Sequence, residues 1–246
     1  MIFCGAERQK RSRARTEDAS APELCPAESG GASTHGRSSV PSGSVTPARY
    51  IAFEGAEGCG KSTQAARFAE HAGAVLTRET GGTHIGAQLR SILHDNSISN
   101  MSARAEALIA AADRAQHIDE VVQPALDAGR IVVSDRSVYS TLAYQGYGRE
   151  LDVDSIRTVN DWATGGLWPE VVVFIDTPDD VIAERMARRD LDRFEAAGDA
   201  FHDRVLEGFR TMAEADPGRW ITVTAVGSIE QVGTQIDAAL ADRVVR

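Results

Sequence analysis

Residues 55–62 read Gly-Ala-Glu-Gly-Cys-Gly-Lys-Ser and match the pattern G-x-x-x-x-G-K-[ST], which restricts the possible folds of this chain more than any other feature. Glycines in such a loop let backbone N–H groups converge on phosphate oxygens, and the helix that follows adds its positive N-terminal end. Lys61 is one of two lysines in a chain with 24 arginines, and its ammonium is a compact point charge that can reach between two phosphates. The pattern therefore predicts a nucleoside triphosphate site.

The neighbours of this loop support that interpretation. Residues 49–53 read as a short apolar strand and residues 62–69 as a helix, so the loop joins a strand to a helix. The hydroxyl of Ser62 is suited to Mg²⁺. We expect a bound nucleotide to contact the whole loop, namely Gly55, Ala56, Glu57, Gly58, Cys59, Gly60, Lys61, Ser62 and Thr63.

Apolar, strand-like runs alternate with helical stretches along the chain. The runs are residues 50–54, 74–77, 131–134, 171–176 and 220–224. The helical stretches are residues 61–71, 85–93, 103–128, 152–164, 178–189, 199–213 and 229–244. This alternation predicts an α/β fold in which a parallel sheet of five strands carries helices on both faces. Ligands of such sheets bind beyond the carboxyl ends of the strands, so the segments after the first four strands should meet in one cleft.

The first 48 residues differ in composition from the rest of the chain. They are rich in serine, glycine and proline and poor in large apolar side chains, which predicts a disordered arm at 1–48 and one folded domain at 49–246. The domain carries 20 basic and 31 acidic residues, a balance that disfavours non-specific nucleic-acid binding. The three cysteines form no disulfide framework, and no apolar run approaches the roughly 20 residues of a membrane span. We therefore expect a cytoplasmic protein that binds neither nucleic acid nor membrane.

Beyond the phosphate loop, further short motifs follow one another at characteristic distances. They are residues 77–83 (TRETGGT), 89–90 (LR), 112–117 (ADRAQH), 135–136 (DR), 140–146 (STLAYQG) and 191–195 (LDRFE). Together with the loop they resemble the thymidylate kinases, enzymes that phosphorylate dTMP with ATP. The resemblance covers about 49–246. It implies a P-loop NTPase-type three-layer sandwich with a short lid, ATP and Mg²⁺ as cofactors, and a homodimer.

The resemblance also implies which residues act in phosphoryl transfer, a reaction that rests on positioning and charge. Lys61 would reach the β- and γ-phosphates of ATP, Ser62 and Asp135 would hold Mg²⁺, and Arg136 would bind the acceptor phosphate. Position 59 is Cys, where some family members place a catalytic arginine in this loop, so the lid would supply that charge. The lid arginines are Arg185, Arg188, Arg189 and Arg193. We predict a catalytic set of Lys61, Asp135, Arg136, Arg188 and Arg193.

An acceptor site follows from the same resemblance. Arg90 would contact the acceptor phosphate, and Glu57 would meet the sugar hydroxyl or the metal. Arg114 would donate to thymine O4, unless it only forms an ion pair with Asp113 or a neighbour. The full predicted acceptor set is Glu57, Arg78, Arg90, Arg114, Arg136, Thr141, Tyr144 and Gln145. In it Arg78 frames the acceptor or forms a structural salt bridge, Tyr144 crowds the 2′ position and so favours deoxyribose, and Thr141 and Gln145 complete the base pocket.

Three positions depart from the family pattern. Ala110 stands four residues before Arg114, where the family has a phenylalanine that stacks on thymine, and Thr80 and Ser137 replace a proline and a tyrosine. We expect Tyr139, Tyr147 or Phe201 to fill the space beside Ala110, or the acceptor to be a different nucleotide. Two alternatives to a dTMP kinase therefore stay open: a kinase of another deoxynucleoside monophosphate, and a nucleotide-binding regulator without turnover.

Overall fold

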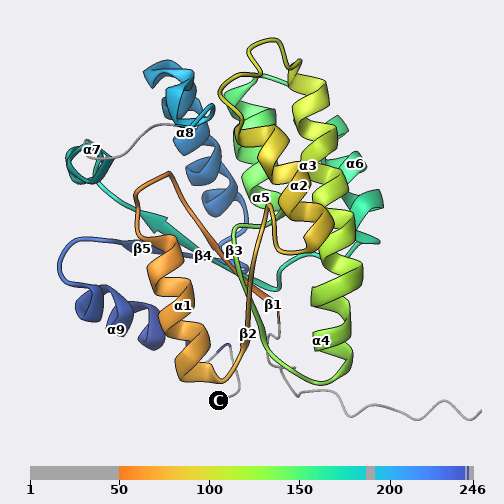
Figure 1. Cartoon of the computed structure of the whole chain (residues 1–246). Helices are drawn as coiled ribbons and strands as arrows, with labels where there is room; N and C mark the ends of the chain where they lie inside the picture. The colour runs from red at the N-terminus through yellow and green to blue at the C-terminus, as the bar shows by residue number, and fades with distance from the viewer. Residues whose placement is uncertain (1–49, 187–191, 242, 244–246) are drawn as a thin grey trace, which may run out of the picture. The chain divides into compact units, whose positions relative to one another are not determined.

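A parallel sheet of five strands forms the centre of the domain in the computed structural model, which describes residues 50–186, 192–241 and 243 (Figure 1). The strands are β1 (Tyr50–Glu54), β2 (Val75–Arg78), β3 (Val132–Asp135), β4 (Val171–Asp176) and β5 (Trp220–Thr224), in the order β2-β3-β1-β4-β5. All four strand pairs are parallel. The sheet confirms the α/β prediction. β1 lies in the middle with every residue buried, as its apolar sequence indicates.

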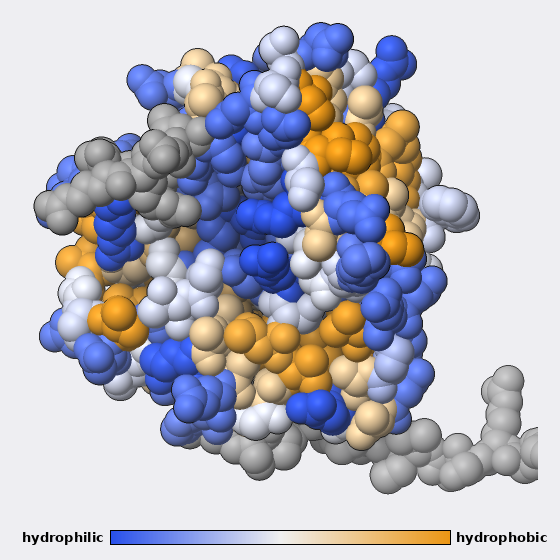
Figure 2. Space-filling model, viewed as in Figure 1, coloured by the Kyte–Doolittle hydropathy of each residue, from blue (hydrophilic) through white to orange (hydrophobic). Residues whose placement is uncertain are grey.

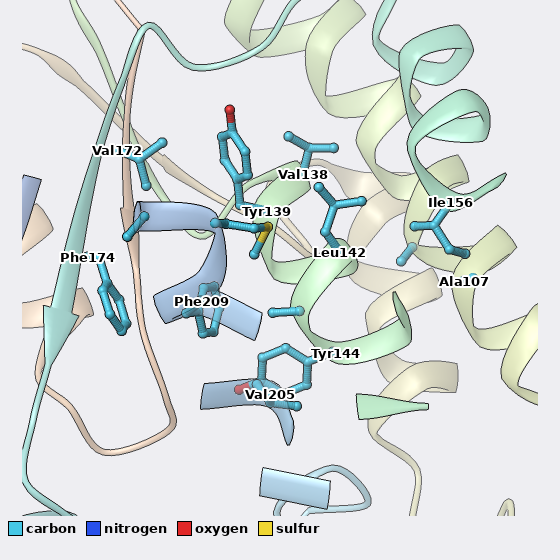
Figure 3. Close-up of a cluster of buried hydrophobic side chains, with 14 of the residues drawn as sticks. Ala107, Val138, Tyr139, Leu142, Tyr144, Ile156, Val172, Phe174, Val205 and Phe209 are labelled. Atoms are coloured by element: carbon cyan, nitrogen blue, oxygen red, sulfur yellow. The ribbon is translucent and has the colours of Figure 1, made fainter. Parts of the chain in front are cut away.

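Helices cover both faces of this sheet. The helices are α1 (Lys61–Ala72), α2 (His84–His94), α3 (Ala103–His117), α4 (Gln123–Asp127), α5 (Val138–Thr141), α6 (Val153–Thr164), α7 (Asp179–Met186), α8 (Asp199–Ala215) and α9 (Ile229–Leu240), with a 3₁₀ turn at Glu195–Ala197. α1 and α9 pack on one face, where Phe53 and Ile175 meet Phe68 and Ile236. On the other face Phe174 of β4 packs against Phe209 of α8, with ring centroids 5.6 Å apart (Figure 3).

Two π-helical segments were not expected from the sequence. The stretch 103–128 is not one helix, because a π-helical turn, η1 (Ile118–Val122), separates α3 from α4. Pro124 has no N–H, and in a regular helix its ring would meet the carbonyl four residues earlier, so a wider turn relieves the conflict. The second segment, η2 (Leu142–Gly148), continues α5. Its residues include Tyr144 and Gln145, and π turns are frequent at functional sites.

No helix was predicted at α5, and the remaining helices agree with the predicted stretches to within a few residues. Asp152 caps α6 by accepting the N–H of Ser155, and Ser228 forms a capping box with Gln231 at the start of α9. The predicted stretch 178–189 is described only as far as Met186, and the predicted arm at 1–48 and the lid residues 187–191 lie outside the described residues. None of the helices that the structure describes is both long and apolar enough to cross a membrane.

Candidate functional site

One cleft of about 590 Å³ opens where the strands end at their carboxyl edge. Its walls come from the phosphate loop, from the segments after β2 and β3, from α3 and from η2. Figure 2 shows hydrophilic residues gathered around a hollow in the middle of this face of the molecule. The predicted convergence of the strand ends is therefore present in the structure.

The phosphate loop is held in a shape that only glycine tolerates at its ends. Gly55 has φ 147°, and a Cβ there would lie 2.7 Å from the carbonyl oxygen of Ile175. Gly60 has φ 98° and starts α1. Lys61 is buried, and its Nζ donates to the carbonyl of Ala56 at 3.1 Å. Thr177 Oγ1 donates to the carbonyl of Cys59 and ties the loop to the end of β4.

Cys59 contributes no charge to this loop. Its thiol is free and buried, and burial raises the thiol pKa even though Lys61 opposes the shift. The side chain therefore stays neutral at physiological pH. It packs with Phe53 and Ala65 beneath the loop.

Asp135 and Ser62 offer a place for a divalent cation. Asp135 ends β3, and one of its carboxylate oxygens, Oδ1, is buried without a hydrogen-bond partner in the described structure. Such an oxygen favours a cation or an ordered water. The exposed Ser62 lines the same cleft. Mg²⁺ commonly binds one or two carboxylates together with water and phosphate oxygens, so this pair fits Mg²⁺. No group of three His, Cys, Asp or Glu residues suited to a metal occurs in the described part of the chain.

Arg136 lies at the junction of the loop and the acceptor side of the cleft. Its φ of 72° is left-handed, a conformation that costs a non-glycine residue about 1–3 kcal/mol. Its guanidinium donates to Glu57, to Ser140 Oγ at 2.9 Å and to the Tyr144 hydroxyl at 3.1 Å. Burial opposes ionisation of Glu57, but Arg136 and Lys61 outweigh it and hold the pKa of that carboxyl well below its usual range. Glu57 is therefore ionised, and Arg136 is fixed beside the loop.

Glu54 holds Arg136 in place through Ser140, and the sequence analysis did not include it among the site residues. It is fully buried at the end of β1 and accepts hydrogen bonds from Ser137 Oγ at 2.7 Å and Ser140 Oγ at 2.6 Å. Burial raises the pKa of Glu54, with Arg136 opposing the shift. Ser140 thus bridges Glu54 and Arg136. One feature of the sequence could have identified Glu54: it is the acidic last residue of an otherwise apolar run.

Arg114 is paired with a residue that the sequence analysis did not identify. Its Nε donates to Glu79 Oε2 at 2.7 Å, and its Nη2 donates to Thr141 Oγ1 at 2.9 Å. Asp113, the suggested ion-pair partner, instead accepts the backbone N–H of Gly81. Burial works against ionisation of Glu79, yet Arg114 and His117 lower the pKa of its carboxyl. The partner of Arg114 lies 35 residues earlier in the chain, and the Asp113 pairing is wrong.

The cleft brings together all eight of the predicted acceptor residues. Its lining includes Glu57, Arg78, Arg90, Arg114, Arg136, Thr141, Tyr144 and Gln145. Arg90 donates to the carbonyl of Thr80, in a segment where the Glu79–Thr80 peptide bond is cis. Gln145 donates to Glu106 Oε1 at 2.8 Å.

The two lid arginines that the structure describes lie in different places. Arg185 lines the cleft and donates to the carbonyl of Gly58 at 3.0 Å. Arg193 donates instead to Glu106 at 2.7 Å and to the carbonyl of Leu93, away from the phosphate loop. Arg188 and Arg189 lie outside the described residues.

Other cleft residues had no role in the sequence analysis. The loop between β5 and α9 contributes Ala225, Gly227, Ser228 and Ile229, and the carbonyl of Ile229 accepts a hydrogen bond from Gln64 of α1. This loop could have been identified in the sequence from Gly227 and Ser228, a glycine followed by a residue that caps a helix. Leu93, His94 and Phe194 line the acceptor side. No local pattern around Phe194 indicated that its side chain would line this cleft.

The aromatic residues expected beside Ala110 do not line the cleft in the described structure. Tyr139 packs against Trp168 and Trp220, and Tyr147 lies against Gly208. Phe201 packs behind Tyr144. None of these three lines the cleft as described, whereas Phe194 does, so the expectation about the space beside Ala110 is wrong.

Comparisons with known proteins point to one family. The family profile described as thymidylate kinase matches residues 53–236. A thymidylate kinase of Nitratidesulfovibrio vulgaris (strain Miyazaki F) is 45% identical over 197 residues, which cover 74% of this chain and 91% of the relative. One of a Synechococcus strain is 43% identical over 201 residues, 79% of this chain and 95% of the relative. The crystal structure of thymidylate kinase from Ehrlichia chaffeensis superposes with a TM-score of 0.66 at 29% identity, covering 80% of this chain and 100% of that one.

Proposed function

This chain belongs to the thymidylate kinase family, ATP-dependent enzymes that phosphorylate dTMP to dTDP, and we propose that it performs this transfer in the cleft described above. One observation carries the proposal. The phosphate loop with Lys61 and the Arg136–Glu57–Tyr144 cluster open into the same cleft, so a triphosphate and a second phosphate can meet there. Holding two anions in line is most of what phosphoryl transfer requires of a protein.

The donor side binds the phosphates of ATP. Backbone N–H groups of residues 55–63 and the N-terminal end of α1 surround the phosphate chain, and Lys61 moves from the carbonyl of Ala56 to the β- and γ-phosphates. Ser62 and Asp135 would hold Mg²⁺. A bound Mg²⁺ would supply positive charge that offsets the negative charge of the phosphates.

The acceptor side binds dTMP by its two ends. Arg136, with Arg90 and Arg78 nearby, binds the 5′-phosphate. Arg114 donates to a carbonyl of the base. A guanidinium has five N–H donors, and the described contacts of Arg114 use four, since Nε and Nη1 each make one bond and Nη2 makes two. One donor on Nη1 therefore remains for thymine.

A lid arginine supplies charge to the transferring phosphoryl group. Arg185 is the described lid arginine that already lies over the phosphate loop. Arg193 could act only after leaving Glu106, and Arg188 stays a sequence-based prediction. An arginine in this role is worth about 10³–10⁵ in rate.

The apolar face of α2, α3 and α6 supports assembly as a homodimer. Ile85 and Ile92 of α2, Leu108 of α3 and Trp162 of α6 are large apolar residues that remain exposed, and Trp162 is 85% exposed. Figure 2 shows apolar residues gathered over α2 and α3. We expect light scattering to give twice the mass of the chain and Trp162→Glu to shift it toward the monomer. The cytoplasmic location stays a prediction.

A panel of acceptors tests the proposed function. The protein is incubated with ATP, Mg²⁺ and one of dTMP, dUMP, dCMP or dGMP, and the diphosphate product is identified by chromatography. We expect dTMP to give the highest kcat/KM. Equal or better turnover of another acceptor would favour the kinase alternative. Binding of ATP and Mg²⁺ without product from any acceptor would favour a regulator.

A further inference from the structure

Ala110 leaves the base end of the cleft without an aromatic side chain from α3. Glu106, Ala110 and Arg114 follow at four-residue intervals and share one buried face of that helix. Arg114 marks the base end of the cleft, and the methyl group of Ala110 one turn earlier offers no ring for stacking. The same cleft wall contains Phe194, which packs in one apolar cluster with Ala110 and Tyr144.

Phe194 is held in this place by the residues before it. Arg193 donates to Glu106 Oε2 at 2.7 Å and to the carbonyl of Leu93 at 2.8 Å. Asp192 forms a pair with His94 Nδ1 at 2.6 Å. These bonds fasten the segment after the lid to the end of α2 and to the Glu106 face of α3.

The ring of Phe194 is also oriented by its neighbours. It makes edge contacts with His94, at 5.2 Å between centroids, and with Tyr144, at 5.9 Å. The guanidinium of Arg193 lies over the ring at 4.7 Å. Tyr144 in turn accepts a hydrogen bond from Arg136, and Phe194 lines the same cleft as Tyr144 and Arg114. A rigid, partly shielded ring at the cleft wall is suited to contact a planar base.

We propose that Phe194 is the aromatic contact of the acceptor base and takes the place that Ala110 leaves open on α3. The assignment rests on the proposed function, because it concerns the acceptor of that reaction. It makes base binding depend on the segment after the lid, and hence on the Arg193–Glu106 link. An aromatic contact of this kind changes affinity by about 2- to 13-fold.

The experiment compares dTMP with 2-deoxyribose 5-phosphate, which has the sugar and phosphate but no base. The dissociation constants of dTMP and ATP and the inhibition constant of 2-deoxyribose 5-phosphate are measured for the wild type and for Phe194→Leu. Phe201→Leu is the matched control, because Phe201 also packs against Tyr144, at 6.0 Å, but does not line the described cleft. We expect Phe194→Leu to weaken dTMP binding by about 2- to 13-fold and to leave the affinities for ATP and 2-deoxyribose 5-phosphate unchanged. The control should leave all three unchanged.

A swap variant tests whether the two positions share one space. Ala110→Phe/Phe194→Ala should bind dTMP more tightly than Phe194→Ala alone, because it returns a ring to the base end. Unchanged dTMP affinity in Phe194→Leu, an equal loss for 2-deoxyribose 5-phosphate, or no recovery in the swap would each overturn the assignment. A wild type that does not phosphorylate dTMP overturns the proposed function with it. Normal wild-type turnover with unchanged Phe194→Leu affinity overturns only the role of Phe194.

Discussion

Removing the charge of Glu79 should destabilise the whole domain. Glu79 and Arg114 are 4% and 2% exposed, and the carboxylate accepts from Arg114 Nε at 2.7 Å and from His117 Nδ1 at 2.9 Å. Breaking a buried pair by removing one partner costs about 3–5 kcal/mol, because the other charge stays buried. The remaining partners of Arg114 are neutral, so nothing in its contacts replaces the lost charge. For a domain of this size, Glu79→Gln should therefore lower Tm by about 6–20 °C.

Urea unfolding and calorimetry of the ligand-free protein measure this effect. Glu214→Gln is the control, since Glu214 is exposed on α8 and should change the unfolding free energy by less than about 0.5 kcal/mol. Glu79→Gln/Arg114→Met removes both charges and should cost less than the sum of the single variants. If Glu79→Gln unfolds within about 0.5 kcal/mol of the wild type, the reasoning about this pair is wrong.

The same pair predicts how stability changes with pH. The pKa of Glu79 is lower in the folded protein than its ordinary value of 4.5, so the folded state favours the ionised form. The contribution of ionised Glu79 to the free energy of unfolding is complete above pH 4.5. This contribution is lost as the pH falls through the lowered pKa of Glu79. The difference in unfolding free energy between wild type and Glu79→Gln should therefore shrink below pH 4.5.

Three further predictions concern the cleft. Lys61→Ala should lower kcat by about 10²–10³-fold and leave the circular dichroism spectrum unchanged, because it removes a charge that stabilises the transferring phosphates; a near-wild-type rate contradicts the mechanism. Asp135→Asn should raise the Mg²⁺ concentration for half-maximal activity roughly 10-fold, and an unchanged Mg²⁺ titration contradicts the metal assignment. Ser140→Ala removes the bridge between Glu54 and Arg136 and should raise the KM for dTMP about 5-fold with the KM for ATP unchanged; equal changes in both would argue for a general loss of structure.

The phosphate loop and the strands could be predicted because their signals are local. The loop needs glycines at fixed positions beside one lysine, and Gly55 and Gly60 indeed have positive φ. β4 is a continuous apolar run, and its bounds, Val171–Asp176, agree with the prediction. A strand buried on both faces leaves this pattern in the sequence itself.

The partners of buried charges could not be predicted in the same way. Glu79 meets Arg114 only because β2 ends beside α3, and Arg193 meets Glu106 across 87 positions of sequence. The local pattern around Arg114 offered only Asp113, its neighbour in the chain. Contacts of this kind depend on how elements pack, and a single sequence records no distance between them.

The acceptor side of the cleft contains residues that could be predicted from local patterns and residues that could not. Thr141 and Gln145 lie at helical spacing on either side of Tyr144 and were predicted to complete the base pocket, but the π-helical segment that contains Tyr144 and Gln145 was not expected. Phe194 reaches the wall through bonds made by Asp192 and Arg193 to α2 and α3. The substitution at Ala110 was visible in the sequence, whereas the place of Phe194 in the same cleft wall was visible only in the structure.

A crystal structure with a non-hydrolysable ATP analogue, Mg²⁺ and dTMP is the most direct test. We predict the triphosphate within hydrogen-bond distance of the 55–63 loop and Lys61, the phosphate of dTMP bonded to Arg136, and thymine beside Arg114. An empty phosphate loop, or dTMP bound away from Arg136, would contradict the account.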